Sequence, residues 1–96
     1  MLFVVTATDM IGALALRMKT REAHLAYLRE GNAVKLAGPF VNEQGEPVGS
    51  MLIIEAADLD AAKAWAAADP YAKAGLFLSS DVRRWNATIN LCEAKL

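Results

Sequence analysis

The order of strand-forming and helix-forming segments constrains the fold of this chain more than any other feature of its sequence. Runs of β-branched and aromatic residues predict four strands, at residues 2–8, 34–41, 50–56 and 82–91. The helical spacing of apolar residues predicts two helices between them, at residues 21–30 and 59–68. The order β-α-β-β-α-β is typical of the split βαβ, or ferredoxin-like, α+β sandwich, in which two helices cover one face of an antiparallel sheet.

Local signals mark where these segments begin and end. Thr20 and Asp58 are residue types that cap helix N-termini, so each is expected to precede a helix. Residues 42–47 (Asn-Glu-Gln-Gly-Glu-Pro) have the composition of a turn, which joins the second and third strands as a hairpin. Asp69 followed by Pro70 predicts one more N-cap and first helical position.

Apolar side chains occupy both faces of the first predicted strand, with Leu2 and Val4 on one face and Phe3 and Val5 on the other. The buried side chains expected from the other segments are Leu25, Leu28, Leu59, Ala62, Trp65 and Trp85. A chain of 96 residues supports only one thin core, and a second apolar sheet face is too large to leave in water. The sequence therefore predicts a homodimer in which two sheets face each other, with further assembly left open. A polar row on the last strand, at Arg84, Asn86, Thr88 and Asn90, is expected to line a cavity in that interface.

Charge and composition exclude several classes of function. The formal net charge is −1, from 10 basic and 11 acidic side chains without a basic tract, so no nucleic-acid partner is expected. No apolar run approaches the ~18 residues of a membrane span, and the apolar N-terminus lacks the basic region of a signal peptide. No membrane partner is therefore expected, and the cytoplasm is the predicted location. Residues 1–96 are interpreted as a single domain.

Five short motifs carry a resemblance to a known family. They are Arg21-Glu22-Ala23-His24-Leu25, Leu36-Ala37-Gly38-Pro39-Phe40, Gly49-Ser50, Ala68-Asp69-Pro70-Tyr71 and Ala74-Gly75-Leu76-Phe77. Together, in this order and spacing, they resemble the YciI-like (YCII-related) family, which is similar in fold to muconolactone isomerase and other small dimeric α+β barrels. The resemblance implies a pocket with a His–Asp pair, which here corresponds to His24 and Asp69. It implies no particular substrate.

Residues 10–19 depart from the pattern of this family. Together with Asp9, the segment fits either a short helix or an ordered connection, because Gly12 weakens the helical pattern. It leads directly into the helix that carries His24. If it shapes the mouth of the pocket, the choice of substrate differs from that of relatives.

His24 and Asp69 are the candidate catalytic residues. His24 is the only histidine, and an imidazole can take up and release a proton near neutral pH. A carboxylate within hydrogen-bond reach of one ring nitrogen would fix its tautomer. Each residue also has a purely structural interpretation: a histidine on the flank of a helix bonded to the backbone, and an aspartate that caps the turn at Pro70.

The candidate substrate-binding residues are Arg21, Gly38, Pro39, Phe40, Ser50 and Tyr71. Arg21 would bind an anionic oxygen, or else pair on the surface with Glu22 or Asp81. The backbone N–H of Gly38 or Phe40 would face a ligand, since Pro39 has none, unless Gly38 and Pro39 mark only a bulge. Ser50 would supply a hydroxyl to the pocket, or else it only starts a strand. Tyr71 would form an aromatic wall of the pocket, or else it packs in the core. Arg83, beside Trp85, fits a second anion anchor or simple stacking.

The function that these residues favour is a small cofactor-free enzyme of the lyase or isomerase type. His24 would move a proton on a small anionic, aromatic-derived substrate, Asp69 would orient it, and Ser50 or a backbone amide would stabilise the oxyanion. No metal is expected, because one histidine and one cysteine, Cys92, do not make a dedicated site; no nucleotide cofactor motif is present. The alternatives are a non-catalytic dimeric module that binds or senses a small ligand, and a cofactor-independent oxygenase.

Overall fold

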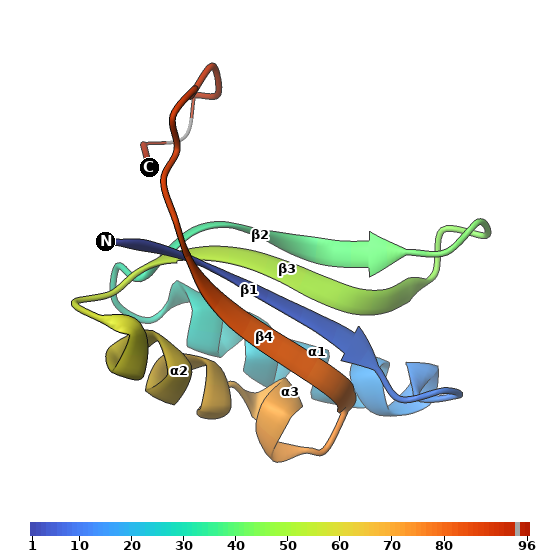
Figure 1. Ribbon diagram of the computed structural model, residues 1–96. Helices are drawn as coiled ribbons and strands as arrows, with labels where there is room; N and C mark the ends of the chain where they lie inside the picture. The colour runs from blue at the N-terminus through green and yellow to red at the C-terminus, as the bar shows by residue number, and fades with distance from the viewer. Residues whose placement is uncertain (94) are drawn as a thin grey trace.

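One four-stranded sheet with helices on a single face makes up the computed structural model, which describes residues 1–93 and 95–96 (Figure 1). Its elements are β1 (Leu2–Asp9), α1 (Leu14–Arg29), β2 (Val34–Val41), β3 (Pro47–Glu55), α2 (Leu59–Ala67), α3 (Pro70–Lys73) and β4 (Phe77–Trp85). The strands pair antiparallel in the order β2-β3-β1-β4. This is the ferredoxin-like α+β arrangement predicted from the order of segments.

The core lies between the sheet and the helices and is centred on β1. Because side chains along a strand point alternately to opposite faces, Phe3 and Val5 of β1 point towards the helices and are almost fully buried. They pack with Leu52 and Ile54 of β3 and with Ala62 of α2. Trp65 is half-buried against this cluster, whereas Leu59, which was predicted to be buried, is 40% exposed. The helix therefore meets the sheet from Ala62 onward, and its first residue stays outside.

Helix α1 begins at Leu14, which makes it longer than predicted. Thr20 was expected to be its N-cap, and that prediction is wrong: the Thr20 hydroxyl donates to the carbonyl of Leu16 from within the helix, at 2.8 Å. A threonine that bonds back by one turn satisfies its hydroxyl in a helix interior, so its presence does not require a helix start. The turn before the helix is made by Gly12, whose φ is 73°. Residues 14–20 therefore join the helix that carries His24.

The hairpin of β2 and β3 is close to its prediction. Strand β2 has the predicted bounds, and β3 begins three residues earlier than residue 50, at Pro47. In the turn, the side-chain oxygen of Asn42 accepts hydrogen bonds from the backbone N–H groups of Gln44 and Glu46, at 3.0 and 2.9 Å. An asparagine bonded to its own following backbone is a recurrent way of closing such a turn.

Strand β4 starts five residues earlier than predicted. It pairs with β1 from Asp9↔Phe77 to Leu2↔Trp85, and β1 begins at Leu2, so no partner strand continues past Trp85. The alternation of polar and apolar residues after Trp85 therefore does not form a strand, so of the predicted polar row only Arg84 lies on β4. Trp85 itself, expected in the core, is 38% exposed on the far side of the sheet.

The sheet face opposite the helices is uncovered in this chain and rich in apolar side chains. Its large exposed members are Leu36, Phe40, Met51 and Trp85, which are 38–45% exposed. Figure 1 shows all three helices on the other side of the sheet and the C-terminal segment leaving from the end of β4. Within the described part of the chain, no helix is long and apolar enough to cross a membrane.

Candidate active site between helix and sheet

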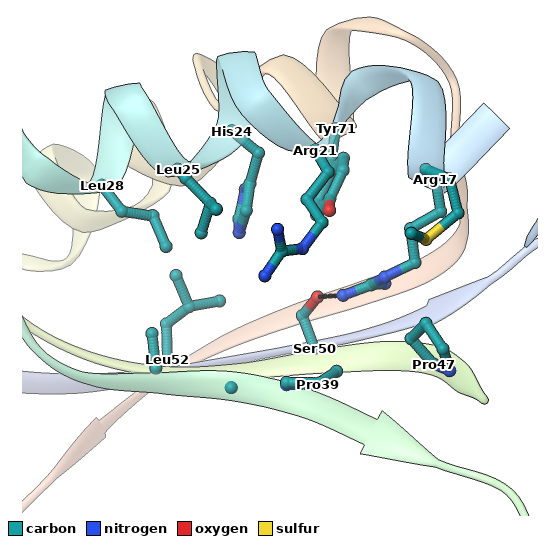
Figure 2. Close-up of a pocket in the computed structure, with 13 residues that line it drawn as sticks. Arg17, Arg21, His24, Leu25, Leu28, Pro39, Pro47, Ser50, Leu52 and Tyr71 are labelled. Carbon is teal, nitrogen blue, oxygen red and sulfur yellow. Dashed lines mark hydrogen bonds between the residues drawn. The ribbon is translucent and has the colours of Figure 1, made fainter. Parts of the chain in front are cut away.

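A pocket of about 480 Å³ opens between α1 and the β2–β3 half of the sheet (Figure 2). Its lining residues are Arg17, Met18, Arg21, His24, Leu25, Leu28, Ala37, Gly38, Pro39, Pro47, Ser50, Leu52 and Tyr71. Leu25, Leu28 and Leu52 lie towards one end of the pocket, and Arg17 and Ser50 towards the other, with His24 and Arg21 between them. The pocket is therefore apolar at one end and polar at the other.

One face of α1 supplies the polar groups. Arg17, Arg21, His24 and Leu28 follow one another at spacings of four, three and four residues, which places them on the same side of an α-helix. This side faces the sheet, and Figure 2 shows Arg21 and His24 pointing into the pocket. The spacing would have revealed Arg17 in the sequence had the helix been extended back to Leu14.

His24 and Asp69 are brought together across 45 positions of the chain. Nδ1 of His24 lies 2.8 Å from Oδ1 of Asp69, and both residues are buried, with exposed fractions of 7% and 3%. The same carboxylate oxygen accepts the backbone N–H of Tyr71, at 2.9 Å, and so caps α3. The capping interpretation and the histidine contact are therefore both correct for Asp69. When Nδ1 carries the proton it donates to Asp69, which leaves Nε2 as the basic nitrogen.

Tyr71 packs between His24 and Arg17. The rings of His24 and Tyr71 are stacked, with centroids 3.9 Å apart and planes inclined by 16°, and Cζ of Arg17 lies 4.7 Å from the Tyr71 centroid. Tyr71 is only 2% exposed, so core packing describes its ring better than an open aromatic wall does. Burial raises the pKa of Tyr71 above its usual value, although the positive charges of Arg17 and Arg21 lower it. Its hydroxyl is therefore protonated at neutral pH.

A buried cluster that sequence reasoning missed adjoins this stack. Nη1 of Arg17 donates to both carboxylate oxygens of Asp9, at 3.0 and 2.9 Å, and Nη2 donates to Oγ of Ser50, at 2.9 Å. The exposed fractions of Arg17, Asp9 and Ser50 are 4%, 9% and 2%. Ser50 is thus a pocket residue, as predicted for its hydroxyl, but it is held by a residue from the segment whose structure was ambiguous.

Arg21 is the exposed cation of the pocket. No ion pair within 4.0 Å involves it among the residues that the structure describes. Asp81, one of its expected surface partners, instead contacts Arg83, at 3.5 Å. Arg83 pairs in register with Val4 and is strongly exposed on the uncovered face, away from the pocket. It is therefore not placed to anchor a ligand there.

The Gly38-Pro39-Phe40 motif divides between the two faces of the sheet. Pro39 is opposite Ser50 in the register and lines the pocket, as does Gly38. Phe40 is opposite Gly49 and does not line it; its side chain is 45% exposed on the uncovered face. The Phe40 side chain points away from the pocket because successive residues of a strand point to opposite sides; a ligand contact through the backbone N–H of Gly38 or Phe40 stays a prediction.

Metal chemistry has no candidate centre in the described part of the chain, where no three His, Cys, Asp or Glu side chains are grouped to hold an ion.

The fold and the pocket together define a ferredoxin-like α+β domain with a histidine–aspartate contact under its first helix. Comparison with known families then assigns the chain: it belongs to the family of the YCII-related domain, whose model matches residues 1–86. Protein YciI of Escherichia coli is 41% identical over 87 residues, covering 80% of this chain and 88% of that protein. An uncharacterised protein of Haemophilus influenzae is 36% identical over 86 residues, covering 80% and 88%.

Solved structures agree with this assignment. A 5-chloro-2-hydroxyhydroquinone dehydrochlorinase from Burkholderia phenoliruptrix, in complex with 2,5-dihydroxybenzoquinone, superposes with a TM-score of 0.82. It is 35% identical and the match covers 90% of this chain and 94% of that one. An antibiotic biosynthesis monooxygenase, at 16% identity and a TM-score of 0.58, shares the fold, with coverage of 93% and 100%.

Proposed function

We propose that the chain is a cofactor-free acid/base enzyme that eliminates or isomerises a small anionic substrate with a ring or a similarly compact apolar body. The observation that carries the proposal is the 2.8 Å contact between His24 and Asp69 beside a pocket that holds the unpaired cation of Arg21. The dehydrochlorinase to which the chain is similar carries out an elimination, by its name, and its complex contains a hydroxylated ring.

The chemistry begins with proton transfer from carbon. Nε2 of His24 takes a proton from a carbon next to a carbonyl carbon, which in a hydroxylated ring is supplied by the keto tautomer, and the C–H electron pair moves towards the carbonyl to form an enolate. Arg21 and the Ser50 hydroxyl stabilise the negative oxygen, and Asp69 stabilises the imidazolium through Nδ1–H. A positioned base of this kind contributes about 10²–10⁴-fold to the rate.

The enolate has two outcomes, both without net oxidation or reduction. In an elimination, its electron pair forms a new π bond and expels an anion, such as a halide, from the adjacent carbon; His24 then gives its proton to water. In an isomerisation, His24 returns the proton to a different carbon of the same molecule. Both outcomes use Nε2 of His24, the ring nitrogen that the contact with Asp69 leaves available beside the pocket.

The test is chloride release from 5-chloro-2-hydroxyhydroquinone, followed together with a panel of small ring-bearing carboxylic acids. We expect turnover in the native protein and loss of at least about 10²-fold in His24→Asn, which keeps a similar shape but removes the base. Lys73→Ala, at an exposed position of α3, is the matched control. Binding that persists in His24→Asn with no turnover in any variant would favour a non-catalytic ligand-binding module.

We also infer that two copies pair through the uncovered sheet face. The support is the concentration of large apolar side chains there, at Leu36, Phe40, Met51 and Trp85. This face lies on the opposite side of the sheet from the pocket, so pairing leaves the helix side open to substrate.

A further inference from the structure

We propose that Arg17 is a positioning residue of this pocket: held by Asp9, it turns the hydroxyl of Ser50 towards the ligand and clamps Tyr71 against His24. The proposal rests on the proposed function and deepens it, because it assigns how the anionic oxygen of the substrate and the imidazole are both held in place.

The burial of Arg17 is the first reason. Its guanidinium forms a two-point pair with Asp9, and both residues are removed from water at the wall of the pocket. Taking two charges out of water costs free energy that their mutual attraction offsets only in part, so a buried pair is weak evidence for a purely stabilising role. Because Asp9 balances the charge of Arg17, the pair as a whole has no net charge to offer a ligand. Arg21 is the cation that meets the anion directly, and Arg17 acts through its neighbours.

The second reason is the direction of the Ser50 hydroxyl. A serine oxygen that accepts a hydrogen bond from Arg17 keeps its own hydrogen for another acceptor. Ser50 lines the pocket, on the strand opposite α1, so that acceptor is a ligand oxygen. Donation from a charged group into the hydroxyl also strengthens its own donation. The corner formed by Ser50 and Arg21 therefore fits a phenolate, enolate or carboxylate oxygen.

The third reason is the stacking of the His24 ring on the Tyr71 ring. The imidazole of His24 is fixed in its plane by Asp69 and across its face by Tyr71. Arg17 packs against Tyr71 as well, 4.7 Å from its centroid, and Figure 2 shows Tyr71 lying between the other two residues. Attraction between a cation and an aromatic face is considerable when both are desolvated. Removing Arg17 leaves one side of Tyr71 unsupported, and His24 loses part of its alignment.

The clamp is tested without any substrate. Because His24 is the only histidine, its imidazole C–H resonances are identified without ambiguity, and stacking on Tyr71 shifts them upfield. We expect Arg17→Gln to broaden these resonances and move them downfield. Arg29→Gln, at the exposed end of the same helix, should leave them unchanged. If Arg17→Gln leaves a buried, unpaired Asp9 and fails to fold, the variant with both Arg17→Gln and Asp9→Asn removes the two charges together. Unshifted resonances in a folded variant overturn the clamp.

The orientation of Ser50 is tested by a double-mutant cycle on binding of 2,5-dihydroxybenzoquinone. Ser50→Ala and Arg17→Gln should each weaken binding by about ten-fold, and the double variant should be no weaker than either, since both remove the same directed donor. Effects that multiply, or Arg17→Gln without effect, overturn the orienting role. Tight binding to the native protein with no turnover of any substrate refutes the proposed enzyme and leaves this proposal standing; failure of the native protein to bind the probe counts against the oxygen-binding corner.

Discussion

At the scale of single residues, Asp69 shows how one carboxylate can serve the fold and the site together. Its Oδ1 caps the four-residue helix α3 and contacts His24 through the same atom. The sequence indicated the cap from the Asp-Pro pair alone, by local chemistry. The contact with His24 depends on how α1 and α3 pack, which local chemistry does not specify, and only the resemblance to a family implied it.

Substitution of Asp69 by asparagine should change the tautomer of His24. An amide oxygen accepts a hydrogen bond more weakly than a carboxylate does, so the fraction of imidazole with the proton on Nδ1 should fall. Nitrogen chemical shifts of the single imidazole report this directly. If the shifts in Asp69→Asn equal those of the native protein, Asp69 does not set the tautomer. Turnover, where it is found, should fall by at least about 10²-fold.

Alkaline pH should destabilise the protein through its two tyrosines. Burial is the largest cause that raises the pKa of both Tyr71 and Tyr27 above the usual value of about 10. The folded chain therefore keeps these protons to higher pH than the unfolded chain does. The stability that this difference in pKa contributes is fully present below pH ~10. It is lost as the pH rises through the pKa values of the tyrosines in the folded chain.

Ultraviolet difference absorbance of tyrosinate and denaturant unfolding at stepped pH measure this effect. Arg17→Gln should raise the pKa of Tyr71 further, because the charge of Arg17 lowers it in the native protein. Tyrosinate that forms at the ordinary pH in the folded native chain would contradict the expectation.

At the scale of elements, the sequence predicted which strands and turns are present better than it predicted the residues at which elements begin and end. Strand β2 and the cap at Asp58 are confirmed, since their signals are local. The start of α1 was missed because a threonine can cap a helix or bond back within one. The end of β4 was missed because alternation continues where β1 no longer offers a partner. Arg17 was missed with the start of α1, and Asp9 lies at the end of β1, one residue beyond the predicted strand, so their buried pair was not predicted.

Close packing of β1 against β3 predicts that Gly49 has no tolerated substitute. A Cβ at Gly49 would overlap the backbone carbonyl oxygen of Ala7, which belongs to the neighbouring strand and has little freedom to move. Gly49→Ala should lower the free energy of unfolding by about 1–3 kcal/mol, as overpacking generally does. Denaturant unfolding measures the loss. Gly38→Ala is the matched control on β2, because nothing lies within 4 Å of its Cβ position; equal stability of the two variants would refute the packing argument.

At the scale of the whole molecule, the two sides of the sheet have different expected partners. The helix side contains the core and the pocket. The other side exposes apolar residues that no helix in the described part of the chain covers. The sequence predicted the apolar character of this face from both sides of β1, but it assigned Phe40 to the pocket. Alternation along β2 places Phe40 on the uncovered face, where it joins Leu36 and Met51.

Pairing of two copies should therefore fail when a charge enters this face. Phe40→Asp places a carboxylate among Leu36, Met51 and Ile53, where a second sheet would remove it from water without a partner. Sedimentation velocity should show a dimer for the native chain and a monomer for Phe40→Asp. Ala61→Asp, at an exposed position of α2, should remain dimeric because it adds the same charge on the opposite side of the sheet. A native chain that is monomeric at micromolar concentration, or a dimer that survives Phe40→Asp, would rule out this face. Because the pocket lies behind the sheet, a monomeric Phe40→Asp should keep the His24 resonances of the native protein, which separates assembly from the chemistry of the site.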